Sequence, residues 1–372
     1  MIKESIIIKN FGPLKNVNID EVKKLNIFIG DSGTGKSTIM KVLVLFQWIY
    51  KQMCLRSYLK LSGVKENVKT FDFKEYLAYN GILDYLQKET EIIYTRASYE
   101  IIFKNGRLGN TNFVIKKEDL SFEKMSYISE KRNMIPGLIS NPFSSTMISD
   151  FYLAETIRDF MTAVKDLNEI EIPAINAYLK KEKKHIGLSR LVINDKENSY
   201  SLPLRHSSSG MQNVAPLYTI INYFAKNYKM NDSMKKTIKR YMFEADIIEQ
   251  FSPKFNLDEI KNHNIHLHIE EPELSLYPEG QIQLMNDLLK LCFTKENQSE
   301  KEFSIIISTH SPYIMNYLNL VIKNGPLIFN DITAYRVMDG EVFSLMKPNN
   351  QIVDTRSLSD PISEIYKQYN TK

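Results

Sequence analysis

The chain has 372 residues, with 48 basic and 44 acidic side chains, a formal net charge of +4 and 43% hydrophobic residues. This composition is typical of a soluble globular protein with two domains, or with one domain that carries a large insertion. Its two cysteines, Cys54 and Cys292, exclude a disulfide-stabilised miniature fold, and no run of about 20 apolar residues could span a membrane. We therefore expect a cytoplasmic protein, and the small net charge leaves the partner open.

The first third of the sequence predicts a strand, a glycine loop and a long helix in that order. Short β-branched apolar runs at residues 6–8 and 25–29 predict strands, and a glycine follows the second run. Apolar residues at helical spacing between 36 and 61, without proline or glycine, predict a helix. Alternating stretches within 91–115, broken by Asn-Gly and Gly-Asn turns, predict antiparallel strands.

The remainder of the sequence mixes helices and strands. Lys- and Glu-rich sequence or helix-spaced apolar residues predict helices at 141–184, 209–228, 234–251 and 280–293. Apolar runs and turn residues predict strands at 265–269 and 303–308, and hairpins at 191–204 and 333–346. The polar tail at 352–372 has only weak periodicity. Together these patterns predict an α/β fold.

Residues 30–37, with the sequence GDSGTGKS, fit the phosphate-binding pattern G-x-x-x-x-G-K-[ST] between a strand and a helix. Glycines allow successive backbone N–H groups to point inward, and the N-terminus of the helix adds the positive end of its dipole. We expect Lys36 to reach the β- and γ-phosphates of ATP, and Ser37 to coordinate Mg²⁺. The expected binding residues are Gly30, Asp31, Ser32, Gly33, Thr34, Gly35, Lys36, Ser37 and Thr38. The alternative is a glycine-rich turn without a ligand.

Two carboxylates, Glu270 and Glu271, follow the apolar strand predicted at 265–269. Ligands of open α/β sheets bind at this edge, outside the carboxyl ends of the strands. We expect Glu270 to face Mg²⁺, directly or through water, and Glu271 to be the general base that polarises the attacking water. The alternative is a charged loop after a core strand.

His310 follows the apolar strand predicted at 303–308, so we expect it at the same edge of the sheet. An imidazole there could donate a hydrogen bond to the γ-phosphate and orient it, because phosphoryl transfer depends on positioning and charge stabilisation. The candidate catalytic residues are therefore Lys36, Glu271 and His310. A single histidine of this kind is otherwise a structural residue.

A hydroxyl-rich turn that contains Ser208, Ser209 and Gly210 leads into the helix predicted at 209–228. Because a helix N-terminus binds anions, this turn is a second candidate phosphate site. Taken alone, such a run is more often an N-cap of the helix.

The order of GDSGTGKST, SSSGMQ, HLHIEEPELSLYP and STHSPYI resembles the ATP-binding cassette heads of the SMC, RecF and OLD-like group of bacterial AAA family ATPases. The resemblance covers nearly the whole chain. It implies a P-loop NTPase of the ABC/SMC head type, with a mixed central sheet, an antiparallel β extension and a helical lobe. It also implies one composite ATPase head over residues 1–372, with a nucleotide-binding core lobe at 1–126 and 263–372 and a mainly helical lobe with the signature motif at 127–262.

In such proteins two heads enclose two ATP molecules, so the resemblance implies a homodimer, or a higher oligomer, formed through ATP. Ser208, Ser209 and Gly210 would then contact the γ-phosphate held by the opposite subunit. This sequence departs from the group in the Ser-Ser-Ser-Gly-Met start of its signature and in Tyr277, where histidine is common. The run YISEKRN is similar to a segment of the same branch and makes Arg132 a candidate nucleotide or subunit contact; the alternative is a solvated charge run.

No long coiled-coil arm separates the P-loop from the signature, and the 372 − 310 = 62 residues after His310 are too few for a Toprim nuclease domain. We therefore expect a head that switches a separate effector protein such as a nuclease or a toxin, or that senses DNA, for example in anti-phage defence. One alternative is a RecF-like DNA-repair ATPase, to which lysine clusters at 180–184 and 235–240 could contribute if they are more than solvated helix faces. The other is the ATPase subunit of a membrane transporter.

Overall fold

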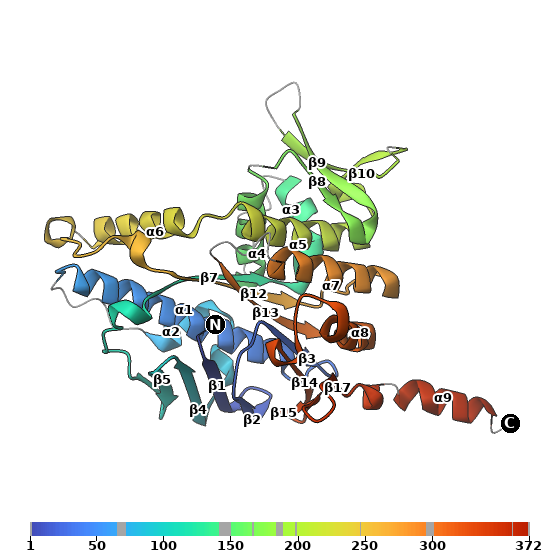
Figure 1. Cartoon of the computed structure of the whole chain (residues 1–372), viewed down its shortest axis with the longest axis horizontal. Helices are drawn as coiled ribbons and strands as arrows, with labels where there is room; N and C mark the ends of the chain where they lie inside the picture. Colours follow the sequence, from blue (N-terminus) through green and yellow to red (C-terminus); the bar gives the residue numbers. More distant parts are fainter. Residues whose placement is uncertain are drawn as a thin grey trace.

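The computed structural model describes residues 2–64, 72–140, 150–165, 167–183, 189–197, 199–245, 247–294, 301–358 and 360–370. A mixed sheet of 11 strands runs through the molecule, and a four-stranded sheet lies in a lobe at one side of it (Figure 1). The strand order of the large sheet is β6-β5-β4-β1-β2-β15-β14-β3-β13-β12-β7.

Five neighbouring strands form the parallel half of the large sheet: β7 (Ser121–Ile128), β12 (Asn262–Glu270), β13 (Glu302–Thr309), β3 (Leu25–Ile29) and β14 (Ile332–Met338). All of β3 is buried, as are β12 and β13 after their first residues. Strands that are buried along nearly their whole length are typical of parallel sheets that are covered on both faces. Because the strands are parallel, the P-loop, Glu271 and His310 follow strand ends at one edge, as the sequence predicts.

Six strands form the other half: β15 (Glu341–Ser344), β2 (Leu14–Ile19), β1 (Glu4–Phe11), β4 (Leu86–Arg96), β5 (Tyr99–Lys104) and β6 (Arg107–Gly109). Strands β2, β1, β4, β5 and β6 pair antiparallel in that order, which confirms the predicted antiparallel extension. The predicted hairpin around Asp339 and Gly340 joins β14 to β15, and both residues have the positive φ that a tight hairpin turn requires.

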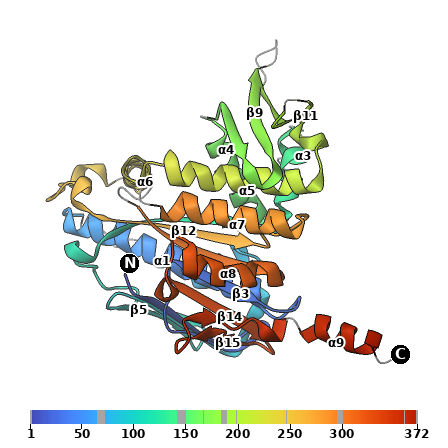
Figure 2. The same cartoon turned by 45° about the vertical axis from the view of Figure 1, so that its right-hand side comes forward.

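Helix α1 (Lys36–Leu61) follows the glycine loop and is buried around most of its surface. Its Gln47 donates a hydrogen bond to Glu4 of β1 over 2.8 Å and lies 3.2 Å from His266 of β12, so α1 contacts both halves of the sheet. Helices α7 (Pro278–Phe293) and α8 (Pro312–Asn324) follow β12 and β13 and cover the parallel strands from the other side (Figure 2). A helix with buried residues around most of its surface, such as α1, has to be covered on several sides.

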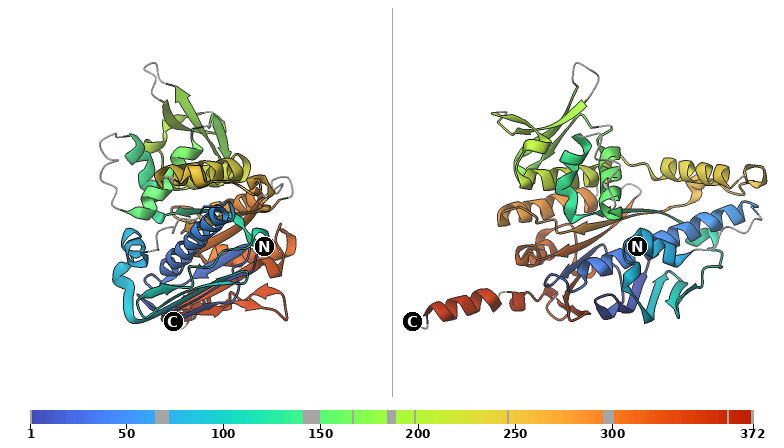
Figure 3. Two further views of the ribbon diagram at one scale, coloured as in Figure 1. Left: turned by 90° about the vertical axis from the view of Figure 1, so that its left-hand side faces the viewer. Right: turned by 180° about the vertical axis from the view of Figure 1, so that it is seen from behind.

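A second lobe projects from the parallel half of the sheet (Figure 3). It contains helices α3 (Ile135–Ser140), α4 (Phe151–Ala163) and α5 (Ser209–Lys226), and a sheet of strands β8 (Glu169–Ile172), β9 (Ala177–Lys183), β10 (Ser189–Asp195) and β11 (Ser201–Pro203). Strands β10 and β11 confirm the predicted hairpin at 191–204. Helix α6 (Met230–Glu244) follows α5 and ends seven residues before the predicted helix end at 251.

The predicted helix at 141–184 is wrong over most of its length. Among the described residues of this range, only α4 is an α-helix, and residues 169–172 and 177–183 form β8 and β9, joined by a single 3-10 turn; residues 141–149, 166 and 184 lie outside the described residues. Ile170, Ile172 and Leu179 are buried at alternate positions, a period of two that the many lysines and glutamates between them obscure. The lysine cluster at 180–183 therefore lies on a strand and not on a helix face.

The weak pattern of the polar tail predicted no element there. Residues 360–370 nevertheless form helix α9 (Asp360–Asn370), which extends away from the rest of the molecule (Figure 1). Asp360 lies in its first turn, where a negative charge interacts favourably with the helix dipole and stabilises the helix. Within the described ranges, no helix is both long enough and apolar enough to cross a membrane.

Candidate functional site

The glycine loop adopts a backbone that only glycine accommodates well. Gly33 and Gly35 have φ values of 79° and 105°, in the region that side chains with a Cβ avoid. A Cβ on Gly35 would lie 2.4 Å from Leu14 Cδ2, and one on Gly30 would lie 2.3 Å from the Val337 carbonyl oxygen. The loop is thus packed closely between β2 and β14 at the N-terminus of α1.

The Lys36 side chain folds back over this loop. Its Nζ donates hydrogen bonds to the carbonyl oxygens of Gly30 and Asp31 over 2.8 and 2.9 Å. Burial lowers the pKa of the Lys36 amine, while the negative charges of Glu271, Asp31 and Glu273 raise it. The ammonium group therefore lies where the loop, the helix N-terminus and the acidic residues after β12 meet.

Glu270 lies at the end of β12 with little exposure. Its Oε1 accepts a hydrogen bond from the Tyr127 hydroxyl over 2.6 Å, and its carboxyl group lies close to the Ser37 hydroxyl. Burial raises the pKa of Glu270 to about 7, and the adjacent carboxyl group of Glu130 adds to the shift. Carboxylate and hydroxyl oxygens are hard ligands that suit Mg²⁺, so Ser37, Glu270 and Glu130 fit a magnesium site beside the P-loop.

Glu271 begins a turn with an unusual backbone. Its φ is 41°, a conformation that costs a residue with a side chain about 1–3 kcal/mol. Its N–H donates to the carbonyl oxygen of Ser308 on β13 over 2.8 Å. Its Oε1 lies 3.4 Å from His310 Nε2, and both side chains are about one-third exposed. The structure therefore brings together the two predicted catalytic side chains from β12 and β13, next to Lys36.

Sequence reasoning missed Glu273, although the sequence EEPE contains it. Its Oε1 accepts hydrogen bonds from the Thr309 hydroxyl over 2.8 Å and from the His310 N–H over 2.7 Å. Ser311, which follows, donates to Gln281 of α7 over 2.5 Å. The end of β13, which carries His310, is thus tied to the loop after β12 and to α7.

Ser208, Ser209 and Gly210 lie at the N-terminus of α5, and both serines are exposed. Ser208 is the N-cap and its hydroxyl accepts from the Met211 N–H over 3.4 Å. Gly210 is buried, and a Cβ on it would lie 2.8 Å from the Ser275 carbonyl oxygen in the loop after β12. The candidate signature therefore packs against the loop of its own Glu271 turn and presents two hydroxyl groups to solvent.

The expectation that Arg132 contacts a nucleotide or another subunit is wrong for this structure. Its side chain is 0% exposed, and its guanidinium group donates to four backbone carbonyl oxygens of the same chain. A charge run such as YISEKRN gives no sign of which member is buried, because burial depends on the strands and helices that meet around it.

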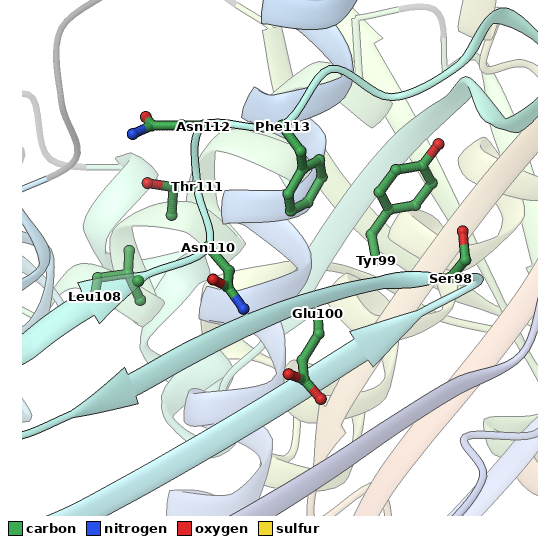
Figure 4. Close-up of a pocket in the computed structure, with 9 residues that line it drawn as sticks. Ser98, Tyr99, Glu100, Leu108, Asn110, Thr111, Asn112 and Phe113 are labelled. Carbon is green, nitrogen blue, oxygen red and sulfur yellow. The ribbon is translucent and has the colours of Figure 1, made fainter.

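A hollow of about 570 Å³ lies elsewhere, beside β5 and β6 (Figure 4). It is lined by residues 98–100 and 108–113, among which the rings of Tyr99 and Phe113 stack with centroids 4.9 Å apart. None of the residues that the sequence predicts for the phosphate site lies in this hollow.

The family described as the AAA ATPase domain matches residues 1–315. A comparison with curated proteins found no match. Among solved structures, the chain is similar to an Smc head domain with an extended coiled coil, bound to the C-terminal domain of ScpA, from Pyrococcus furiosus. The sequence identity is 11%, the match covers 98% of this chain and 100% of that chain, and the TM-score is 0.38.

It is also similar to the SMC head domain from Thermotoga maritima, at 13% identity over 92% of this chain and 97% of that chain, with a TM-score of 0.35. A nucleotide-free ATP-binding cassette from an ABC transporter matches at 13% identity over 92% of this chain and 90% of that chain, with a TM-score of 0.33. The family match covers most of the chain and includes the glycine loop, Glu270, Glu271 and His310. The chain therefore belongs to the AAA ATPase domain family.

Proposed function

We propose that this protein hydrolyses Mg-ATP at the edge of its parallel strands, in a site built from the P-loop, the end of β12 and the end of β13. One observation carries the proposal: the Ser37 hydroxyl and the Glu270 carboxyl group lie close together beside the P-loop, and Glu271 Oε1 lies 3.4 Å from His310 Nε2. The first pair supplies oxygen ligands for a metal, and the second pair supplies a base next to a hydrogen-bond donor.

Each residue then has a distinct role. The N–H groups of residues 30–38 and Lys36 bind the phosphates, and Ser37, Glu270 and Glu130 hold Mg²⁺. When bound, Mg²⁺ neutralises the charge that develops on the phosphoryl group. Glu271 accepts a proton from the attacking water, and His310 orients the γ-phosphate.

We further propose that two copies enclose the nucleotides between them. The support is that α5 directs its N-terminus, with the exposed hydroxyl groups of Ser208 and Ser209, to solvent. The hydrogen bonds of Ser208 and Ser209 within the described residues stay inside α5, so both hydroxyl groups are available to a phosphate bound by another copy.

In this proposal the ATP dimer is a switch for a partner protein in the cell, such as a nuclease or a toxin in anti-phage defence. ATP held between two heads favours the closed dimer, and loss of the γ-phosphate removes that contact. Three lysines of the two clusters have partners within the chain. Lys180 pairs with Glu169, Lys235 pairs with Asp258, and Lys181 donates to two backbone carbonyl oxygens.

Light scattering on purified Glu271→Gln, with and without Mg-ATP, tests the dimer. This variant is expected to bind ATP but to hydrolyse it at least about 100-fold more slowly than the wild type, so the ATP-bound form persists during the measurement. The expected result is a molar mass that doubles only with Mg-ATP, with Lys36→Ala as the blank. A mass that ATP leaves unchanged would contradict the shared site. Phosphate release by the wild type tests hydrolysis separately, and normal turnover in Glu271→Gln would remove the general-base role of Glu271.

A further inference from the structure

The guanidinium group of Arg132 joins three segments of the chain that are far apart in sequence. Its Nη1 donates to the carbonyl oxygen of Glu270 over 2.7 Å and to that of Ser129 over 3.1 Å. Its Nη2 donates to the carbonyl oxygen of Glu271 over 2.7 Å, and its Nε donates to that of Asn213 on α5 over 3.2 Å. Arg132 therefore connects the end of β7, the end of β12 and the first turns of α5.

One of these bonds holds a residue in a disfavoured backbone conformation. Glu271 has a positive φ, and its carboxylate Oε1 lies 3.4 Å from His310 Nε2. Its N–H is held by Ser308 and its carbonyl oxygen by Arg132, so the two ends of this residue are fixed from opposite sides. A residue in a disfavoured conformation persists only where its surroundings hold it, and Arg132 is the side chain that does so here.

Only arginine can make this set of bonds. Its planar fork presents five N–H donors in fixed directions, whereas a lysine ammonium group is a compact charge with three donors on a flexible stem. Burial lowers the pKa of the Arg132 guanidinium group to about 10, while the negative charges of Glu273, Glu270, Glu130 and Glu271 oppose this shift and favour the charged form. Lysine at this position would keep the charge but lose the geometry, so the two contributions can be separated by experiment.

The same side chain reaches the candidate signature. Asn213, whose carbonyl oxygen accepts from Arg132, lies one turn into α5, and its Nδ2 donates to the Ser209 carbonyl oxygen over 3.1 Å and to the Ser275 hydroxyl over 3.4 Å. Gly210 packs on the backbone of Ser275. A short chain of contacts therefore connects the Glu271 turn with the hydroxyl groups that α5 presents to solvent.

We propose that Arg132 is a positioning residue for ATP hydrolysis. It binds the carbonyl oxygens of Glu270, Glu271 and Asn213. In this way it keeps the Glu271 carboxylate in the orientation needed to activate water, and it connects the Glu271 turn with α5. This proposal rests on the ATPase function proposed above. Arg132 does not contact the substrate, so its substitution acts on the chemical step through Glu271 and leaves nucleotide binding to the P-loop.

The test compares Arg132→Lys with the wild type for kcat, for the dissociation constant of a fluorescent ATP analogue and for Tm. We expect kcat to fall about 10- to 100-fold, as for a small displacement of a catalytic group, and the dissociation constant to change less than about threefold. Arg96→Lys is the matched control, because Arg96 is also buried but pairs with Glu4 and Glu123 in the core. It should lower Tm without a comparable loss of kcat.

A second arm repeats Arg132→Lys in the Glu271→Gln background, with single-turnover hydrolysis as the readout. If Arg132 acts through Glu271, the substitution should cause no more than about a twofold further loss there. An equal loss in both backgrounds would overturn the proposal, as would a fall in Tm like that of Arg96→Lys with kcat unchanged.

Arg132→Gln, which buries no charge, is a second variant in case Arg132→Lys is unstable. It should show the same loss of kcat, and failure of both variants to fold would assign Arg132 a purely structural role and overturn the proposal. Absence of hydrolysis by the wild type would overturn the proposed function together with this inference. Hydrolysis that is insensitive to Arg132→Lys would overturn the inference alone.

Discussion

The backbone N–H of His310 donates a hydrogen bond to Glu273 Oε1 over 2.7 Å, and the Thr309 hydroxyl donates to the same oxygen. The loop after β12 therefore fixes the end of β13, so the positions of Glu271 and His310 depend on each other. A carboxylate that accepts two hydrogen bonds holds this strand end more firmly than a neutral amide oxygen would.

Glu273→Ala is expected to lower kcat about 10-fold, because His310 loses the oxygen that fixes its backbone. Glu273→Gln keeps an acceptor oxygen and should lose less. Steady-state phosphate release measures both variants, and Glu279→Ala, an exposed glutamate in the first turn of α7, is the control. Equal activity of Glu273→Ala and wild type would show that the strand end is held without Glu273.

Lys36→Ala is expected to abolish ATP binding, because its ammonium group is the positive charge that lies over the glycine loop. Binding of a fluorescent ATP analogue measures the effect. Lys60→Ala is the matched control, since Lys60 lies in the last turn of the same helix and is exposed. If Lys36→Ala bound the analogue as Lys60→Ala does, the glycine loop would not be the nucleotide site.

Gly210→Ala is expected to weaken the ATP-dependent dimer, because the added Cβ would lie 2.8 Å from the Ser275 carbonyl oxygen and would push the start of α5 away from the Glu271 loop. Gly137→Ala in α3 is the control, since its Cβ would meet no atom within 4 Å. Light scattering with Mg-ATP in the Glu271→Gln background measures the dimer. Normal doubling of mass in Gly210→Ala would contradict the role of this contact.

Asp287 on α7 is expected to make the protein less stable at higher pH. Burial raises the pKa of Asp287 to about 6, and its Oδ2 is buried without a hydrogen-bond partner among the described residues. The folded chain therefore binds more protons than the unfolded chain between the unfolded pKa of 3.8 and about 6. The contribution of protonated Asp287 to the free energy of unfolding is therefore fully present below pH 3.8. It is lost as the pH rises through about 6.

Asp287→Asn removes this ionisation. We expect it to raise the free energy of unfolding by about 1 kcal/mol at pH 8, less than the full shift implies because solvent screens part of the charge, and by a smaller amount at pH 5. Urea unfolding of both proteins at the two pH values measures the difference. A gain of the same size at both pH values would show that charge is not its cause.

The sequence by itself determined the parts of the site that depend on local backbone. The glycine loop requires positive φ values that glycines provide, and the strands before Gly30, Glu271 and His310 carry the β-branched and other apolar residues that mark buried strands. Parallel strands place their carboxyl ends at one edge, so the proximity of the P-loop to these two side chains followed from the pattern. The antiparallel extension followed from its turn residues.

Only the tertiary structure decided what Arg132, Glu273 and residues 169–183 do. Arg132 binds the carbonyl oxygens of Glu270 and Glu271, which lie 138 and 139 positions further along the chain, and no local spacing encodes such a contact. The lysines of β9 hide a two-residue period that becomes a strand because β8 and β10 pair with it. Hydrogen bonds between distant segments and strand pairing depend on the packed fold, whereas glycine turns and apolar runs act within a few residues.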